Sequence, residues 1–386
     1  MKLLVFSPYY PPHMGGLESH ADEFNRHLSQ RGMDITVFTP RLPVSAPEKE
    51  NWHRGVKILR FPAFEIIPNY PVPKFWSLRF WKLFRNLFEE NFDIVISRTR
   101  FFSTSLLALA YAKIKKIRWV HIEHGSDFVR LSSRLKTEVA RLYDLSFGRI
   151  IFKSSDLNIS ISKAVREFVE KFDKRKSPVI YRGIDIEEIE KVTSDEKFRD
   201  QYGNKTIIAW AGRLYKWKGV KNTIEAIKKL PEKIKKNVVF VVIGDGEDKE
   251  YLQKISDKSV IFLGSIPREK VLGILKVSDI YIHSSDPGGG LSTSLLEAMC
   301  CRCGIIATKN EGADEVIDGN ENGILLENNS PKIIAEKIIE LAGSKERTNS
   351  HANKAHDNIL EKFGWRKSID NYLEIFQKIS AKKTEN

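Results

Sequence analysis

A repeated alternation of short apolar runs with longer segments of helical periodicity is the feature that most constrains how this chain can fold. In the first half the apolar runs are Leu3–Ser7, Ile35–Thr39, Val56–Phe61, Asp93–Ser97, Arg118–Glu123, Leu157–Ile161 and Val179–Tyr181. After a charged segment, 187–200, which we take as the start of an interdomain passage, the pattern restarts at Thr206–Trp210. Such alternation is typical of a parallel sheet whose strands are joined by crossover helices. The sequence therefore predicts an α/β protein.

The length and the apolar content bound the number of domains and the compartment. The 386 residues are about twice a typical domain, so we expect two domains of roughly 150–200 residues each. No apolar run reaches the roughly 18 residues that a spanning helix needs. Met1-Lys2 is followed at once by a strand-like run instead of a signal peptide. These features predict a cytoplasmic protein.

The cysteines and the net charge say what kinds of partner to expect. Cys300, Cys301 and Cys303 lie in one short stretch, which favours buried apolar positions over a disulfide or a zinc site. The net charge is +13, and residues 1–185 carry 31 Lys and Arg against 19 Asp and Glu, which leaves 32 against 31 in the remainder. The basic excess of the first half indicates an anionic partner for that half.

Residues Lys74–Phe88 interleave aromatic with basic side chains. The aromatic ones are Phe75, Trp76, Phe80, Trp81, Phe84 and Phe88, and the basic ones are Lys74, Arg79, Lys82 and Arg85. This pattern is typical of a helix lying on an anionic membrane surface. A crossover helix with its apolar face on the sheet gives the same pattern, and the residues do not decide between the two. No nucleic-acid motif accompanies the charge, so we expect no nucleic-acid partner.

Two loops at predicted strand ends in the first half are candidate ligand contacts. Gly15 and Gly16 close a proline-fixed loop, and their lack of side chains lets the backbone meet a ligand or a facing domain before a helix at 18–31. His124 follows the run Arg118–Glu123, and open α/β sheets place ligands at the carboxyl ends of their strands. We therefore select His124 as a substrate contact and leave out His121, which fits a core position equally well.

The second half holds a strand, a glycine loop and a helix start in succession. Asp279–Ser284 enters three glycines, Gly288–Gly290, and a helix-forming segment, Ser292–Met299, follows. The glycines allow a ligand to approach the backbone, Ser292 or Thr293 can cap the helix, and the helix dipole favours an anion there. The pattern predicts an anion-binding loop, with a plain surface turn as the alternative.

Two cations follow the strand that restarts the pattern. Arg213 and Lys218 flank a loop bounded by Gly212 and Gly219. A guanidinium and an ammonium are the pair expected to hold a diphosphate, although two solvated surface charges give the same spacing.

Neither a dinucleotide fingerprint nor a simple metal motif is complete. Gly244-Asp245-Gly246 matches only part of the dinucleotide pattern. Asp-x-Asp, the simplest way to bring a divalent metal to a diphosphate, does not occur in the sequence.

Taken in chain order, these residues resemble the retaining glycosyltransferases of family 4, also called glycosyl transferases group 1. The resemblance rests on Pro11-Pro12-x-x-Gly15-Gly16-x-Glu18, His124-Gly125, Gly183-Ile184-Asp185, Gly212-Arg213-Leu214, Lys218-Gly219, Gly244-Asp245-Gly246, Leu263-Gly264, Gly290-Leu291 and Leu296-Glu297-Ala298-Met299. Each motif is weak alone, whereas the ordered set is specific and covers nearly the whole chain.

The resemblance implies the GT-B fold, with two facing Rossmann-like domains and the active site in the cleft between them. Residues 1–190 would form the acceptor domain and residues 191–364 the donor domain. Residues 365–386 would form a helix that packs back onto the N-terminal domain.

The resemblance also implies roles for individual residues. Arg213 and Lys218 would hold the diphosphate as catalytic cations, Glu297 would hydrogen-bond the ribose, and His124 would lie near the transferred sugar. The donor-binding residues that it implies are Gly15, Gly16, Gly244, Gly264, Gly289, Gly290, Leu291, Ser292 and Glu297.

The implied function is a retaining hexosyltransferase that needs neither a metal nor another cofactor. It would move a sugar from a UDP- or GDP-sugar to a hydroxyl of a lipid-linked or other glycan acceptor. Its place would be the cytoplasm or the inner face of the membrane, with Lys74–Phe88 on the anionic surface.

The sequence departs from the family pattern at several positions. Gly289 stands where the family has the first of two glutamates, Arg182 where an asparagine is common, and Arg302 and Gly304 replace small and proline residues. Two alternatives therefore stay open, a sugar-nucleotide-binding protein without catalysis and a nucleotide-sugar epimerase of the same fold.

Overall fold

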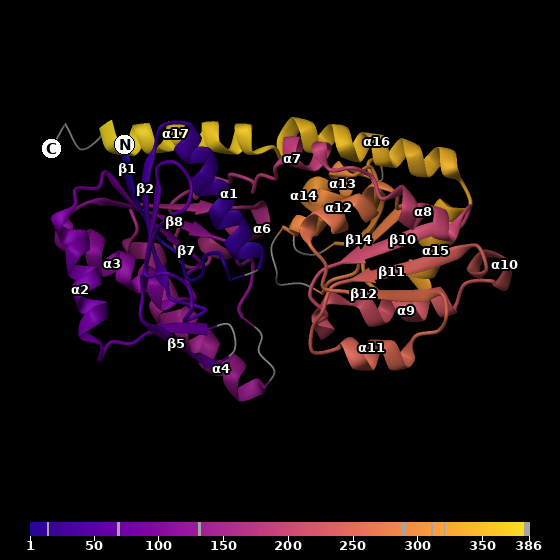
Figure 1. The fold of residues 1–386 in the computed structure, drawn as a ribbon, viewed down its shortest axis with the longest axis horizontal. Coiled ribbons are helices and arrows are strands. Elements are labelled where there is room, and N and C mark those ends of the chain that lie inside the picture. Colours follow the sequence, from indigo (N-terminus) through magenta and orange to yellow (C-terminus); the bar gives the residue numbers. More distant parts are fainter. Residues whose placement is uncertain are drawn as a thin grey trace. The chain divides into compact units, whose positions relative to one another are not determined.

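The computed structural model describes residues 1–13, 15–67, 70–129, 133–286, 291–309, 312–319 and 321–381 (Figure 1). The chain divides into two compact units. Unit 1 comprises Met1–Gly183 and Trp365–Asn386, and unit 2 comprises Ile184–Gly364. The division after Gly183 falls earlier than the predicted boundary at 190/191, because the helices at 186–191 and 196–202 belong to unit 2.

Unit 1 is built on a seven-stranded sheet of order β3-β4-β2-β1-β7-β8-β9, parallel except for the β3–β4 pair. Its strands are β1 (Lys2–Phe6), β2 (Asp34–Pro40), β3 (Lys49–Asn51), β4 (Val56–Phe61), β7 (Ile94–Arg98), β8 (Arg118–Glu123) and β9 (Leu157–Ser160). A separate antiparallel hairpin pairs β5 (Ala63–Ile67) with β6 (Tyr70–Pro73). The helices are α1 (Gly16–Gln30), α2 (Leu78–Asn86), α3 (Ser103–Lys115), α4 (Arg134–Tyr143), α5 (Arg149–Ser154), α6 (Lys163–Glu170) and α17 (Trp365–Ala381).

The strand predicted at Val179–Tyr181 is wrong. Only a single bridge forms there, between Val179 and Ser160. Pro178 precedes the segment and has no amide hydrogen with which to extend a ladder.

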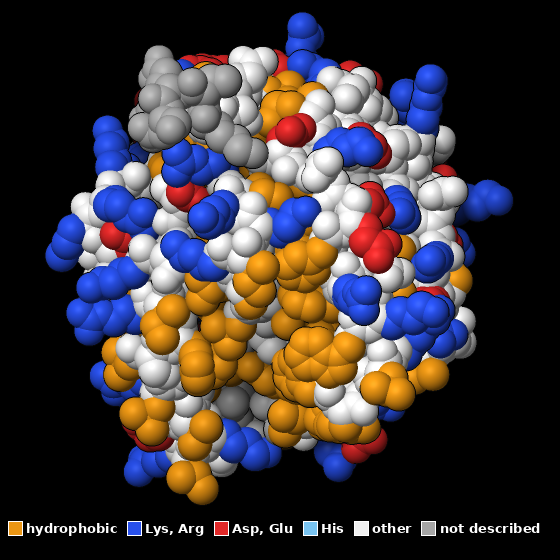
Figure 2. Space-filling model, turned by 90° about the vertical axis from the view of Figure 1, so that its left-hand side faces the viewer, with side chains coloured by type: hydrophobic (Ala, Val, Ile, Leu, Met, Phe, Trp, Pro, Cys, Tyr) orange, Lys and Arg blue, Asp and Glu red, His pale blue; other side chains and the backbone are white. Residues whose placement is uncertain are grey.

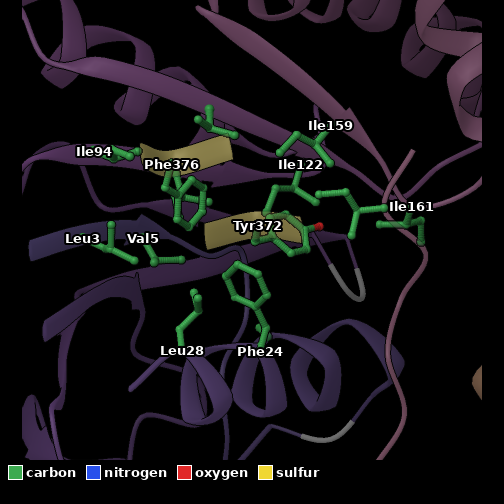
Figure 3. Close-up of a cluster of buried hydrophobic side chains, with 14 of the residues drawn as sticks. Leu3, Val5, Phe24, Leu28, Ile94, Ile122, Ile159, Ile161, Tyr372 and Phe376 are labelled. Carbon is green, nitrogen blue, oxygen red and sulfur yellow. The ribbon is translucent and has the colours of Figure 1, made fainter. Parts of the chain in front are cut away.

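Side chains of β1 alternate between two cores, one on each face of the sheet. Leu3 and Val5 point into a core that α1 and α17 cover, where Figure 3 shows Phe24, Leu28, Tyr372 and Phe376 against the strands. Leu4 and Phe6 point into the opposite core, which α2 and α3 cover. Residues from the end of the chain therefore complete the hydrophobic core of the first half.

Unit 2 is built on a six-stranded parallel sheet of order β12-β11-β10-β13-β14-β15. Its strands are β10 (Thr206–Ala211), β11 (Val238–Ile243), β12 (Val260–Gly264), β13 (Ile280–His283), β14 (Gly304–Thr308) and β15 (Ile324–Leu326). Its helices are α7 (Ile186–Lys191), α8 (Glu196–Tyr202), α9 (Val220–Lys228), α10 (Glu232–Lys235), α11 (Lys249–Ile255), α12 (Arg268–Lys276), α13 (Thr293–Cys300), α14 (Ala313–Val316), α15 (Pro331–Ala342) and α16 (Lys345–Lys362). The predicted α/β class with parallel sheets is confirmed.

The cysteines occupy buried positions at and after the end of α13. Cys300, Cys301 and Cys303 are free thiols, each at most 5% exposed. Burial raises the pKa of Cys300 to about 12. Their role as small apolar core residues is as predicted.

The segment Lys74–Phe88 is amphipathic. Phe80, Leu83 and Phe84 are buried against the sheet, so the crossover-helix interpretation holds for this face. The opposite face leaves Trp76 at 72% and Leu78 at 87% exposed. In the described part of the chain, no helix is both long and apolar enough to cross a membrane.

Candidate functional site

The predicted cations of unit 2 lie at the point where the strand order of its sheet reverses. From β10 the chain proceeds to β11 and β12 on one side, and then returns to β13 on the other side of β10. At such a switch point the loops leave in opposite directions, and open α/β sheets bind ligands at the carboxyl ends of the strands there. The loops after β10 and β13 are therefore the natural ligand-binding elements of unit 2.

The loop that carries the two cations is fixed by main-chain hydrogen bonds. The Gly212 amide donates to the Ile243 carbonyl at 2.9 Å, and the Leu214 amide donates to the Asp245 carbonyl at 2.9 Å. Leu214 is buried and anchors the loop, whereas Arg213 is exposed. The Nζ atom of Lys218 lies 4.1 Å from the Trp217 ring centroid. Both predicted cations thus stand on one anchored loop.

This loop is joined to the loop after β13. The Asp286 amide donates to the Trp217 carbonyl at 2.7 Å, and the Ser284 hydroxyl donates to the Lys218 carbonyl at 3.2 Å. Gly219 has φ +70°, and a Cβ there would overlap the Ser284 carbonyl oxygen. The position therefore requires glycine.

Gly244 and Gly264 lie at the ends of the two neighbouring strands. The Gly244 amide donates to the Gly264 carbonyl at 2.8 Å. Gly244 has φ +136°, and a Cβ there would overlap the Gly212 carbonyl oxygen beside Arg213. These predicted donor-binding glycines bring the backbones of three strand ends together.

The predicted residues of α13 lie where the helix begins. Ser292 is the N-cap residue, but its hydroxyl lies 3.1 Å from that of Ser294 and makes no capping bond to the backbone. Leu291 is buried at 2% exposed. Glu297 is 8% exposed, and its Oε1 accepts a hydrogen bond from Nε of Arg268 at 2.7 Å. Gly289 and Gly290, also predicted, lie outside the described residues.

The remaining predicted residues belong to unit 1. Gly15 precedes α1 and Gly16 begins it, at the end of the loop that follows β1. A Cβ at Gly15 would crowd the Glu18 carboxylate, which lies 2.6 Å from Nδ1 of His13. His124 follows β8, and its amide donates to Oε1 of Glu123 at 3.0 Å. Gly15, Gly16 and His124 thus lie in loops that follow strands of unit 1, as the sequence predicted.

His124 belongs to a polar group that sequence reasoning missed. Its ring lies 4.9 Å from the His20 ring, and Nδ1 of His20 lies 2.9 Å from Nη1 of Arg98. Burial, followed by the charges of Arg98 and Arg182, lowers the pKa of His124 well below its usual value, so its imidazole is neutral at pH 7. The available signal was an arginine placed directly after the apolar run Asp93–Ser97.

His121 is a core residue. It is fully buried, with Nδ1 2.7 Å from the Ser97 hydroxyl and Nε2 3.2 Å from Oε2 of Glu123.

Among the residues that the structure describes, no three His, Cys, Asp or Glu side chains are grouped so that they could hold a metal ion.

Comparison with known proteins gives the family. The model for glycosyl transferases group 1 matches residues 191–358, and that for Glycosyltransferase Family 4 matches residues 14–188. An uncharacterised glycosyltransferase of Methanocaldococcus jannaschii is 46% identical, over 98% of this chain and 99% of the relative. The GPI3 subunit of phosphatidylinositol N-acetylglucosaminyltransferase from Saccharomyces cerevisiae is 25% identical, over 98% of this chain and 83% of the relative.

Solved structures share the fold. A sucrose-phosphate synthase from Thermosynechococcus elongatus superposes with a TM-score of 0.82 at 15% identity, covering 98% of this chain and 99% of that one. Anabaena HepE in complex with UDP-glucose superposes with a TM-score of 0.75 at 19% identity, covering 98% and 100%. The fold is therefore GT-B, and the chain belongs to the glycosyltransferase family that the two sequence models describe, family 4, group 1.

Proposed function

We propose that this glycosyltransferase is a retaining hexosyltransferase that moves a sugar from a UDP- or GDP-sugar to a hydroxyl of a lipid-linked or other glycan acceptor. The observation that carries the proposal is the placement of Arg213 and Lys218 on one anchored loop at the switch point of unit 2. A guanidinium and an ammonium there can hold a diphosphate and stabilise the charge that develops as it departs. The complex of Anabaena HepE with UDP-glucose supports a nucleotide-diphosphate sugar as donor.

The proposed reaction needs no metal. The bond between the anomeric carbon and the diphosphate oxygen breaks, and the acceptor hydroxyl forms the new bond on the face that the nucleotide leaves. Attack on that face retains the configuration without a protein nucleophile, and the hydroxyl proton passes to the departing phosphate oxygen. Arg213, Lys218 and the first amides of α13 would stabilise the departing charge, Glu297 would hydrogen-bond the ribose, and His124 would contact the transferred sugar.

A turnover assay separates this proposal from its alternatives. Purified protein is incubated with UDP- or GDP-sugars and a lipid extract, with and without EDTA, and the products are analysed. Transfer that survives EDTA, with the donor's anomeric configuration kept, is the expected result. Nucleotide binding without turnover across a broad acceptor panel would favour the inactive protein. An epimerised sugar formed without acceptor would identify an epimerase.

Removing either cation should weaken nucleotide binding. For Arg213→Ala or Lys218→Ala we expect UDP or GDP affinity to fall by roughly 1.5–3 kcal/mol, since each change removes a charge-assisted contact. Isothermal titration measures it. Lys216→Ala, on the same loop, is the matched control and should change affinity by less than about 1 kcal/mol. Equal effects at all three positions would mean that the loop acts only through its net charge.

The exposed face around α2 is proposed to rest on an anionic membrane surface. Figure 2 looks at unit 1 from the side on which α2 lies in Figure 1 and shows hydrophobic side chains gathered together, with Lys and Arg around them. Phe75, Trp76, Leu78 and Trp81 are each between 43% and 87% exposed. Aromatic side chains among cations suit the boundary between head groups and acyl chains. Contact there would bring a lipid-linked acceptor to the enzyme.

Replacing both exposed tryptophans should release the protein from vesicles. Trp76→Ala with Trp81→Ala is expected to weaken binding to anionic vesicles about tenfold or more, because both indoles leave the interface. Co-sedimentation with phosphatidylglycerol vesicles measures it. The matched control replaces Trp52 and Trp217, which are 38% and 40% exposed. Equal sedimentation of both double variants and the parent would show that α2 serves only the fold.

A further inference from the structure

Unit 1 contains a buried group of basic side chains at the carboxyl ends of its central strands. Arg98 is the last residue of β7 and is fully buried, His20 lies on α1, and His124 follows β8. Arg182, near the end of the first segment of unit 1, is 7% exposed, and its Nη2 donates to the Gly16 carbonyl at 3.2 Å. These four residues, here called the Arg98 cluster, come from four separate stretches of the chain.

Arg98 has no anionic partner among the described residues. Its Nη1 contacts neutral His20, and its guanidinium carbon lies 4.5 Å from the Phe24 ring centroid. Its Nε and Nη2 atoms are buried and make no hydrogen bond within the described part of the chain. Burial lowers the pKa of Arg98 to about 10, so the guanidinium stays charged at neutral pH. Burying an uncompensated charge costs several kcal/mol.

Two arginines of unit 1 outside the Arg98 cluster, Arg60 and Arg100, are also buried. Arg60 donates to Glu50 at 2.7 Å, and Arg100 contacts both Glu123 and Asp144 at 3.0 Å. Each of these guanidiniums is neutralised by a carboxylate that the fold supplies. Arg98, equally buried, is not, so folding alone does not account for its charge.

The polar surroundings of Arg98 add positive charge and few acceptors. Arg182 acts on Arg98 as a second cation, while the hydroxyls of Tyr10 and Tyr372 are its other polar neighbours. Nearby carboxylates are engaged elsewhere. Glu123 is held by Arg100, and Asp22 accepts a hydrogen bond from the Tyr10 hydroxyl at 3.1 Å.

The two unsatisfied nitrogens have a geometry that selects their ligand. Nε and Nη2 share one edge of a guanidinium, and this edge donates two parallel hydrogen bonds to two oxygens of one phosphate or carboxylate. The edge lies at the end of β7, beside β1, where the strand order of the unit 1 sheet reverses. Such a point is where open α/β sheets bind their ligands.

We propose that the Arg98 cluster binds a phosphate group, monoester or diester, carried by the acceptor substrate. Two guanidiniums favour a phosphate, with its larger charge, over a carboxylate. Only His124 in the cluster is more than slightly exposed, so the phosphate would enter past His124 and lie beside the residue proposed to contact the transferred sugar. The assignment to the acceptor rests on the proposed function, whereas phosphate binding itself does not.

Arg98→Met tests the site through opposite effects with and without ligand. Without phosphate, the variant should melt at or above the temperature of the parent, because a buried uncompensated charge is removed. Arg60→Met is the control, a buried arginine with a carboxylate partner, and should melt lower. Inorganic phosphate or glycerol 3-phosphate, compared with chloride at equal ionic strength, should raise the melting temperature of the parent and of Arg60→Met by more than that of Arg98→Met, which keeps only the cations of unit 2. An equal shift of the melting temperature in all three proteins would overturn the proposal. It would also be overturned if the parent showed no shift with either soluble probe and no shift with phosphatidylglycerol vesicles.

Two further arms make the result specific. Stabilisation by glycerol 3-phosphate indicates a soluble phosphate ester, whereas Arg98-dependent binding of phosphatidylglycerol vesicles alone indicates a lipid head group; either supports the site. If Arg98→Met does not fold, Arg98→Lys is the second variant, because it keeps the charge but lacks the edge with two nitrogens. Phosphate should bind to it about tenfold more weakly than to the parent. Unchanged phosphate affinity would overturn the proposal. UDP titration of the same variants reports on unit 2, so loss of phosphate binding with UDP binding intact separates this site from the donor site.

Discussion

Arg100→Met is expected to lower the free energy of unfolding of unit 1 by about 3–5 kcal/mol. Arg100 is 1% exposed, and its Nε and Nη2 donate to the two carboxylate oxygens of Asp144 at 3.1 and 3.0 Å. Its Nη1 lies 3.0 Å from Oε1 of Glu123. Burial alone would raise the pKa of Glu123, but the Arg100 charge, His121 and the Gly125 amide bring it below its usual value. Without the guanidinium, two buried carboxylates would lose their counter-charge.

Urea unfolding of the full chain measures this effect. Arg118→Met is the control, because Arg118 pairs with Asp156 at 2.8 Å with both side chains about one-third exposed. Such a surface pair contributes at most about 1 kcal/mol. If the two variants unfold at the same urea concentration, the Arg100 pairs contribute no more to stability than a surface pair.

Gly244→Ala is expected to destabilise unit 2 and to weaken nucleotide binding together. The substitution would place a side chain at φ +136° and against the Gly212 carbonyl. Backbone strain costs about 1–3 kcal/mol and the overlap a similar amount, so we expect a total loss of about 2–5 kcal/mol. Since Gly212 precedes Arg213, relief of the overlap would shift the cation loop, and UDP or GDP affinity should fall as well.

Gly203→Ala separates strain from overlap. Gly203 also has a positive φ, +53°, but nothing lies within 4 Å of the position of its Cβ. It should lose only the cost of the backbone strain, about 1–3 kcal/mol of stability, and keep its nucleotide affinity. Calorimetry and titration of both variants make the comparison. An unaltered affinity in Gly244→Ala would show that the cation loop does not depend on this contact.

Features fixed by local patterns could be predicted from the sequence. A strand of a parallel sheet is buried on both faces, so it appears in the sequence as a continuous apolar run, as in Val238–Ile243. Such runs can be recognised without knowing which strands pair. Gly219 was named as a boundary of the cation loop and Gly244 as part of a dinucleotide pattern, and both have a positive φ, at which other residues are strained. The position of Arg213 and Lys218 after a strand could be predicted because they follow the apolar run Thr206–Trp210.

Features that depend on distant pairing could not be predicted in this way. Arg98 and Arg100 both follow the same apolar run. Arg100 is neutralised by Glu123 and Asp144, whereas Arg98 has no carboxylate partner among the described residues. Their difference depends on which helices and loops close over each side chain. The sequence pattern of Lys74–Phe88 likewise fitted two interpretations, because a helix can bury one aromatic face and expose another at once.

The discontinuity of unit 1 has a consequence for biosynthesis. Trp365 and Tyr372 of α17 pack against Phe24, and Ile369 and Phe376 belong to the same core, yet all four leave the ribosome after residues 184–364. Unit 2 can therefore finish folding while unit 1 still exposes to solvent the apolar face that α17 later covers. Chaperones would bind to this exposed face. Unit 1 is thus the first unit to emerge from the ribosome and the last to complete its fold.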